Sequence, residues 1–180
     1  MTLPYPDRLE HTLVLRDGAR LFVRPMRPED AEGITRQFPR LSPEDVRRRF
    51  LAPMKVPPPR LLARMTQIDY DLEMALVAFA DDARDDPLAV VRLIAEPDRA
   101  RAEYAIFVGP DMKGRGLGRT LMEEIIEHAR RTGIGEVYGT ILADNRPMIE
   151  LARKLGFTIA RDPDDGSLVI ARLALGVTPA

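Results

Sequence analysis

The sequence predicts an α/β (α+β) fold, in which one mixed, mostly antiparallel central sheet packs against helices. Three observations predict it. Asp17-Gly18 is a hairpin turn signal between two alternating segments. Three strand-like segments then follow one another in the middle of the chain, with only short turns between them, which is typical of antiparallel strands. Later, one amphipathic helix joins two apolar segments, and such a crossover makes its two strands parallel.

Composition indicates a single globular domain over residues 1–180, with about ten N-terminal and five C-terminal residues loose. The 180 residues are 45% hydrophobic and 31% charged, which allows a substantial core. The formal net charge of −1 argues against general binding to nucleic acid or to a membrane surface. We see no signal peptide and no apolar run long enough to cross a bilayer.

Cysteine is absent from the sequence, which excludes disulfides, thiol nucleophiles and thiolate metal sites. A chain without cysteine fits a cytoplasmic location. His11 and His128 are too few and too far apart for a histidine-based metal site, so we expect no metal.

The first half of the chain is expected to hold a hairpin, short helices and three further strands. Ser42 and Pro43 mark a helix start, because they suit the N-cap and the first helical position. The arginine triplet 47–49 is interpreted as a solvated helix face, with a phosphate- or substrate-binding role as the alternative. The expected strands are 11–15, 20–24, 74–80, 87–94 and 102–108, and the expected helices are 28–38, 43–51 and 60–65, with an extended connection over 53–59.

The second half is expected to alternate helices and strands and to close with a hairpin. Apolar residues at i, i+4 spacing predict a helix from residue 117 to Gly133. A strand over 136–142 should run parallel to the strand that carries Glu103. A helix follows from Asn145 to Gly156, and the last hairpin pairs 157–160 with 168–173.

A glycine-rich turn stands between the central strand and the long helix. Pro110 ends the strand, and Gly114, Gly116 and Gly118 leave the backbone bare where the helix begins. Free N–H groups and the helix dipole bind anions there, so this stretch predicts a phosphate-binding turn. Positive charge around the turn comes from Lys113, Arg115 and Arg119.

Two common phosphate motifs do not fit this turn. A P-loop requires a lysine and a hydroxyl residue after the second glycine, where this chain has Arg115-Gly116. A dinucleotide fingerprint that begins at Gly114 requires a glycine where Arg119 stands. A glycine-rich turn that binds no ligand stays an open alternative.

The pattern that remains, Lys113-x-x-Gly116-x-Gly118, resembles the Q/R-x-x-G-x-G/A signature of the GNAT superfamily of acyl-CoA-dependent N-acyltransferases. A second stretch, Asn145 to Phe157 with its Leu-Gly-Phe end, is similar to the closing helix of that family. The resemblance covers roughly residues 11–175. It implies the GNAT fold, with a splayed parallel strand pair and helices on both faces of the sheet, and acetyl-CoA as acyl donor.

The resemblance also implies which residues hold the donor. The family binds the diphosphate of coenzyme A at the glycine turn and the pantetheine arm between the splayed strands. Carried over by position, these cofactor-binding residues are Ile106, Phe107, Val108, Lys113, Gly114, Arg115, Gly116, Leu117, Gly118, Arg119 and Asn145. Two alternatives stay open, since residues 106–108 could be core alone and Asn145 a helix N-cap alone.

Glu103 is the candidate catalytic base. It is a charged residue in an apolar strand, and alternation puts it on one face with Ala105 and Phe107. We expect apolar surroundings to desolvate this carboxylate and so make it a better base. Alternatives are a carboxylate facing water, a salt bridge, or a base drawn from the acidic stretch with Asp69, Asp71 and Glu73.

Residues 67–74, together with Ala152, resemble the acetyltransferase domain of bacterial Pat-type protein lysine acetyltransferases. In that group a central-strand glutamate at the position of Glu103 serves as base. Many GNAT members have a tyrosine where this chain has Ala152, so the proton for the departing thiolate would come from solvent. The resemblance implies a protein lysine acceptor, with an acyl-CoA synthetase as the candidate protein, and we expect a monomer or a homodimer. A small-molecule amine acceptor and a non-catalytic acyl-CoA-binding regulatory module stay open.

Overall fold

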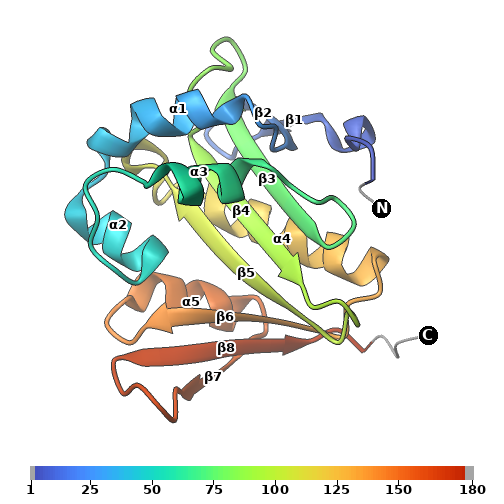
Figure 1. Ribbon diagram of the computed structural model, residues 1–180, viewed down its shortest axis with the longest axis vertical. Coiled ribbons are helices and arrows are strands. Elements are labelled where there is room, and N and C mark those ends of the chain that lie inside the picture. The colour runs from blue at the N-terminus through green and yellow to red at the C-terminus, as the bar shows by residue number, and fades with distance from the viewer. Residues whose placement is uncertain (1–2, 177–180) are drawn as a thin grey trace.

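The computed structural model describes residues 3–176, which form one mixed eight-stranded sheet with helices on both faces (Figure 1). This architecture confirms the predicted fold class. The strands are β1 (His11–Val14), β2 (Arg20–Pro25), β3 (Glu73–Ala80), β4 (Ala89–Ala95), β5 (Arg101–Val108), β6 (Glu136–Leu142), β7 (Thr158–Arg161) and β8 (Leu168–Ala174). The helices are α1 (Asp30–Gln37), α2 (Pro43–Phe50), α3 (Pro59–Thr66), α4 (Leu117–Arg131) and α5 (Arg146–Lys154), with 3-10 turns η1 (Asp7–Leu9), η2 (Phe38–Arg40) and η3 (Pro110–Met112).

The strand order is β1-β2-β3-β4-β5-β6-β8-β7. The first five strands are antiparallel neighbours, and β6 lies parallel to β5, as the crossover through α4 predicts. The last hairpin folds back so that β8, and not β7, pairs along the whole of β6. This places β7 at the edge of the sheet.

The first hairpin has a three-residue loop and not the two-residue turn that Asp17-Gly18 suggested. The Leu15 amide donates to the Ala19 carbonyl at 2.9 Å, which encloses residues 16–18. Gly18 has a φ of +86°, in the left-handed region that glycine adopts without strain. A left-handed third residue is the usual way to close a loop of this length.

The parallel pair β5 and β6 separates soon after it begins. Their ladder contains three residue pairs and ends at Glu103 and Tyr138. Both strands continue well beyond that point, β5 in register with β4 and β6 in register with β8. Figure 1 shows the two strands diverging toward their C-terminal ends. The described residues therefore contain the splayed pair that the family resemblance implies.

Each face of the sheet has its own apolar core. On one face α4 and α5 cover the sheet with residues such as Leu121, Ile125 and Ile149. On the other face Ile34 of α1 packs with Ile68 and with the sheet residues Ala75, Val77 and Phe79. The helix periodicity from residue 117 is confirmed, since Leu117, Leu121, Met122, Ile125, Ile126 and Ala129 are buried.

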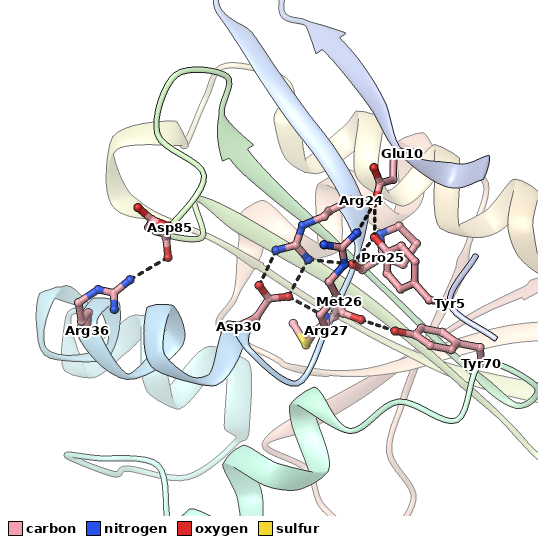
Figure 2. Close-up of polar contacts among 10 residues, drawn as sticks. All are labelled: Tyr5, Glu10, Arg24, Pro25, Met26, Arg27, Asp30, Arg36, Tyr70 and Asp85. Carbon is pink, nitrogen blue, oxygen red and sulfur yellow. Dashed lines mark hydrogen bonds and ion pairs between the residues drawn. The ribbon is translucent and has the colours of Figure 1, made fainter. Parts of the chain in front are cut away.

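A buried ion pair joins β2 to the start of α1 (Figure 2). Two guanidinium nitrogens of Arg24 donate to the two carboxylate oxygens of Asp30, at 2.9 and 2.6 Å. Asp30 also accepts the Arg27 amide at 2.7 Å, and the Arg24 guanidinium lies 4.6 Å from the centre of the Phe79 ring. Both charged side chains are largely shielded from water, so each needs the other.

Part of the N-terminal segment that we expected to be loose makes defined contacts. Tyr5 donates to Glu10 at 2.7 Å and packs edge-on against Tyr70. The expected loose C-terminus lies almost entirely in residues 177–180, outside the described part of the chain. Within residues 3–176, no helix has the length and apolar character needed to cross a membrane.

Removing the Asp30 carboxylate should destabilise the fold severely. We expect Asp30→Ala to lower the free energy of unfolding by about 3–5 kcal/mol, because it leaves the Arg24 charge buried and unpaired. Urea denaturation followed by circular dichroism measures this. As control, Arg36→Ala breaks an exposed pair with Asp86 and should cost less than about 1 kcal/mol. Equal losses in the two variants would contradict this account.

Candidate functional site

The gap between β5 and β6 is the centre of the candidate site. Residues 106–108 pair with Val91, Val90 and Ala89 of β4 on one side, and the ladder with β6 has already ended on the other. The β5 edge that faces the gap is therefore free of strand pairing beyond Glu103. A polar backbone edge requires hydrogen-bond partners, so the gap suits an extended polar ligand.

The glycine turn at the end of β5 presents its backbone as predicted. Gly114 and Gly116 have φ values of +73° and +85°, and nothing lies within 4 Å of where a Cβ would stand on either. The Thr120 amide is the first in α4 to find a helical acceptor, the Gly116 carbonyl at 3.1 Å. Within residues 3–176, no internal acceptor is recorded for the amides of residues 114–119. The turn therefore has the free donors of an anion site.

Carboxylates already hold the three cations predicted at this turn. Arg115 pairs with Asp17 of the first hairpin loop at 2.6 Å, and Arg119 pairs with Glu123 at 2.8 Å. Lys113 pairs with Asp45 of α2. The hydrogen bond from Arg115 lowers the pKa of Asp17. Burial acts to raise the pKa of Asp45, but hydrogen bonds from Lys113 and Ser42 hold it below its ordinary value.

A cavity of about 570 Å³ lies between the hairpin loop and the first turn of α4. Its walls include Arg16 and Asp17 from the loop and Gly114, Arg115 and Arg119 from the turn. The cavity thus adjoins the free amides and two of the three cations. Its size and charge suit a phosphorylated group.

A second cavity, of about 180 Å³, lies on the opposite side of β5, and we call it the α2–α3 pocket. Its floor comes from β4 and β5, where Arg92, Ile94, Glu103 and Ala105 share one face of the sheet. Its walls are Arg49 and Phe50 of α2 and Leu61, Arg64 and Met65 of α3.

Glu103 lies in this pocket, at the last pair before β5 and β6 separate. The predicted alternation is correct, since Glu103 shares a face with Ala105. The expected desolvation is wrong, because Glu103 is exposed. The helices on this face leave a pocket above the strand and do not cover it, so the carboxylate reaches water. Its oxygens make no recorded hydrogen bond or ion pair within residues 3–176.

The alternative acidic residues are engaged elsewhere. Glu73 accepts a 2.5 Å hydrogen bond from Arg92, and Asp71 pairs with Arg99 at 2.7 Å. Asp69 accepts the Asp71 amide at 3.2 Å within its own turn. Two of these three carboxylates are thus neutralised by arginines, and the third is held within its own turn.

Arg49 is a pocket residue for which the sequence favoured another role. The triplet predicts a solvated face, with phosphate or substrate binding as the alternative, but all three arginines are half-buried, and Arg49 lines the α2–α3 pocket. Burial lowers the pKa of Arg49 to about 10, the charge of Arg92 acts in the same direction, and Glu103 opposes both. Within residues 3–176 no ion pair of Arg49 is recorded, whereas Arg47 pairs with Glu44 and Asp144. The unusual run of three arginines was the available signal.

The remaining predicted positions have structural roles as well. Asn145 is the N-cap of α5, and its side chain accepts the Met148 amide at 3.4 Å. Ile106 and Val108 pack toward Gly118 of α4. Ala152 is fully buried in α5. Among residues 3–176, no group of three or more histidine, aspartate or glutamate side chains could hold a metal ion.

Comparison with protein families gives a match over residues 44–157 to the model described as "Acetyltransferase (GNAT) family". A relative from Pseudomonas aeruginosa, "Acetyltransferase PA5475", is 39% identical over 162 residues, which cover 89% of this chain and 87% of the relative. "Acetyltransferase Pat" from Mycolicibacterium smegmatis is 31% identical over 149 residues, or 82% of this chain and 44% of that protein.

Among solved structures, the GNAT domain of S. lividans PAT is similar with a TM-score of 0.86 and 29% identity, over 95% of this chain and 99% of that one. A Salmonella typhimurium structure, yncA with its cofactor acetyl-CoA, has a TM-score of 0.66 at 22% identity, over 89% of this chain and 96% of that one. An L-methionine sulfoximine/L-methionine sulfone acetyltransferase of Pseudomonas aeruginosa is 37% identical over a shorter stretch of 62 residues. This stretch covers 34% of this chain and 36% of that protein.

Releasing Arg115 from Asp17 should strengthen anion binding at the turn. We expect Asp17→Asn to bind inorganic pyrophosphate about 2- to 5-fold more tightly at low salt, the equivalent of one exposed ion pair. Calorimetric titration measures the affinity. As matched control, Glu127→Gln removes a carboxylate paired with Arg131 at the far end of α4 and should leave the affinity unchanged. If the affinity for pyrophosphate rises equally in both variants, the change in net charge explains the effect, and the turn does not.

Proposed function

Since the chain belongs to the acetyltransferase (GNAT) family, whose members take an acetyl group from acetyl-CoA, we propose that it acetylates a protein lysine side chain by direct attack. The observation that carries this proposal is the meeting of three features at β5. A free strand edge faces a gap, unpaired turn amides lie at the end of that strand, and an exposed carboxylate lies at its start.

The donor would occupy the gap and the turn. We assign the diphosphate of acetyl-CoA to the free amides of residues 114–119, with positive charge from Lys113, Arg115 and Arg119. The pantetheine arm would pair with the unladdered edge of residues 106–108, near Asn145. Binding would require the cations to exchange their present carboxylate partners for phosphate oxygens, which form stronger charge-assisted hydrogen bonds.

Glu103 would act as the general base. A free lysine amine has a pKa of ~10.4, so its deprotonation at pH 7 costs about 4–5 kcal/mol. The carboxylate would accept the proton as the amine nitrogen attacks the thioester carbonyl carbon, after which the carbon–sulfur bond breaks. The arginines that line the pocket would assist, because nearby positive charge favours the neutral amine over the ammonium form.

A protein acceptor is supported by two observations. The α2–α3 pocket is small and open to solvent, so it can admit a single extended side chain from a larger partner. The similarity to the GNAT domain of S. lividans PAT extends over nearly the whole of this chain. An acyl-CoA synthetase is the partner suggested by the family resemblance. The absence of cysteine supports the expected cytoplasmic location.

A small amine that carries a carboxylate is the second candidate acceptor. Arg49 has no recorded ion-pair partner within residues 3–176 and could bind such a group beside Glu103. L-methionine sulfoximine, which the name of one relative gives as its substrate, also carries both an amine and a carboxylate. A non-catalytic acyl-CoA-binding module is the third candidate, and thiol release with any amine would exclude it.

Glu103→Gln should retain acetyl-CoA binding and lose turnover. We expect kcat to fall by ~10² or more, the usual contribution of a general base. Release of CoA thiol measures the rate, and calorimetry measures donor affinity. Asp69→Asn is the control for the competing acidic stretch and should retain activity. An active Glu103→Gln variant with an inactive Asp69→Asn variant would assign the base to that stretch.

Arg49→Gln should distinguish the two acceptor classes, because it changes a different kinetic property for each. For a lysine peptide we expect no loss of acceptor affinity and a pH–rate profile shifted upward, because a charge that disfavours the ammonium form is gone. For an amine with a carboxylate, the acceptor KM should instead rise about 10-fold, as a charge-assisted hydrogen bond is lost. The control is Arg101→Gln, which breaks an exposed ion pair between Arg101, at the start of β5, and Glu96.

A further inference from the structure

The hydroxyl of Tyr104 is a polar group that the fold leaves without a partner. Tyr104 is 5% exposed, and its buried oxygen has no hydrogen-bond partner among residues 3–176. The hydroxyls of Tyr5 and Tyr70, in contrast, donate to Glu10 and to the Met26 carbonyl. Buried tyrosine hydroxyls usually find an acceptor, so this one requires an explanation.

Tyr104 stands where the gap opens. The β5–β6 ladder ends at Glu103 and Tyr138, so Tyr104 and Gly139 are the next residues on the two strands. The Tyr104 ring fills the place of a side chain at Gly139, where a Cβ would lie 2.4 Å from a ring carbon. The ring also packs edge-on against Phe157, with 5.3 Å between the ring centres. A larger residue than glycine at 139 would exclude this ring from the gap.

Glu103 and Tyr104 lie on opposite faces of the sheet, because consecutive strand residues alternate. Both residues line the α2–α3 pocket, but the Tyr104 ring packs in the core on the other face, against Gly139 and Phe157. A thioester in the gap would thus have a base on one face and a hydroxyl donor on the other. If the amine enters from the α2–α3 pocket, it attacks the carbonyl carbon from the Glu103 face. The sulfur then leaves on the opposite face, where the Tyr104 side chain lies.

A hydroxyl with no role would be a disadvantage here. Burial without an acceptor destabilises a polar group, and phenylalanine would fill the same space against Gly139 and Phe157 without that penalty. The fold therefore gives no reason for tyrosine over phenylalanine at position 104. An acceptor that arrives with a ligand in the gap gives one.

We propose that the Tyr104 hydroxyl donates a hydrogen bond to the sulfur of the bound thioester and stabilises it as it leaves. The proposal rests on the proposed function, since it requires acetyl-CoA in the β5–β6 gap. In the step, the amine nitrogen bonds to the carbonyl carbon and Glu103 takes the amine proton. The carbon–sulfur bond breaks with its electron pair on sulfur, the thiolate accepts the hydrogen bond from Tyr104, and water later supplies the thiol proton.

The chemistry of the hydroxyl suits a hydrogen-bond donor and not an acid that gives up its proton. Burial raises the pKa of Tyr104, so the hydroxyl stays protonated at neutral pH. A thiol is far more acidic, with an ordinary pKa of ~8.5, so the proton stays on the tyrosine oxygen. A donor of this kind lowers the thiol pKa of bound CoA, because it favours the charged form.

The test is Tyr104→Phe, which removes one oxygen atom. We expect kcat for acetyl transfer to fall roughly 10- to 100-fold, the size of one hydrogen bond to a charged group, with little change in the KM for acetyl-CoA. The melting temperature should be no lower than that of the wild type, because no internal hydrogen bond is lost. Tyr70→Phe is the matched control, with the opposite signature of lower stability and unchanged kcat.

A second measurement does not depend on turnover. The thiol pKa of enzyme-bound CoA, followed by thiolate absorbance against pH, should be lower in the wild type than in Tyr104→Phe. An unchanged kcat and an unchanged thiol pKa in the variant would overturn the proposal. A Tyr104-dependent thiol pKa in a protein that acetylates no amine would uphold this inference while the proposed function fails. A variant that only loses stability would make Tyr104 a structural residue and overturn it.

Discussion

The site depends on a parallel pair of strands that stop pairing after three residue pairs. The separation is tolerated because each strand keeps one complete neighbour, β4 for β5 and β8 for β6. The backbone groups along the inner edges then have no partner within the sheet, and buried backbone groups without partners are unfavourable. Water or an extended ligand must satisfy them. The order of the last two strands is therefore as important as the glycine turn, since β8 is what allows β6 to leave β5.

Local sequence signals predicted most of the architecture. Ser42 and the periodic residues from Leu117 each act over a few positions, and both have the predicted role in the structure. Asp17-Gly18 correctly marked the position of the first hairpin but not the length of its loop. The parallel orientation of β6 could also be predicted from the sequence, because a single helix that joins two neighbouring strands makes them parallel. The placement of β8 inside β7 could not be predicted, because a hairpin can join a sheet through either strand. Ion pairs between distant segments, such as Arg115 with Asp17, carry no local signal either.

The candidate base illustrates the same limit. Alternation along the strand correctly put Glu103 on a face with Ala105, because it depends only on the period of a strand. Whether that face is dry depends on how α2 and α3 pack over it. Here they leave a pocket, so an apolar strand did not imply a buried carboxylate. For Arg49 a solvated face was favoured over a substrate role for the related reason that a charged triplet on a short helix usually faces water.

Helix α2 makes contacts on three sides of the site from alternate residues. Asp45 holds Lys113 beside the glycine turn, Arg47 reaches Asp144 just before α5, and Arg49 lines the α2–α3 pocket. A phosphate group that draws Lys113 away from Asp45 removes one of the contacts that hold this helix, and the same helix forms a wall of the α2–α3 pocket. Occupation of the glycine turn and of this pocket should therefore be coupled through α2, and the coupling acts equally in both directions.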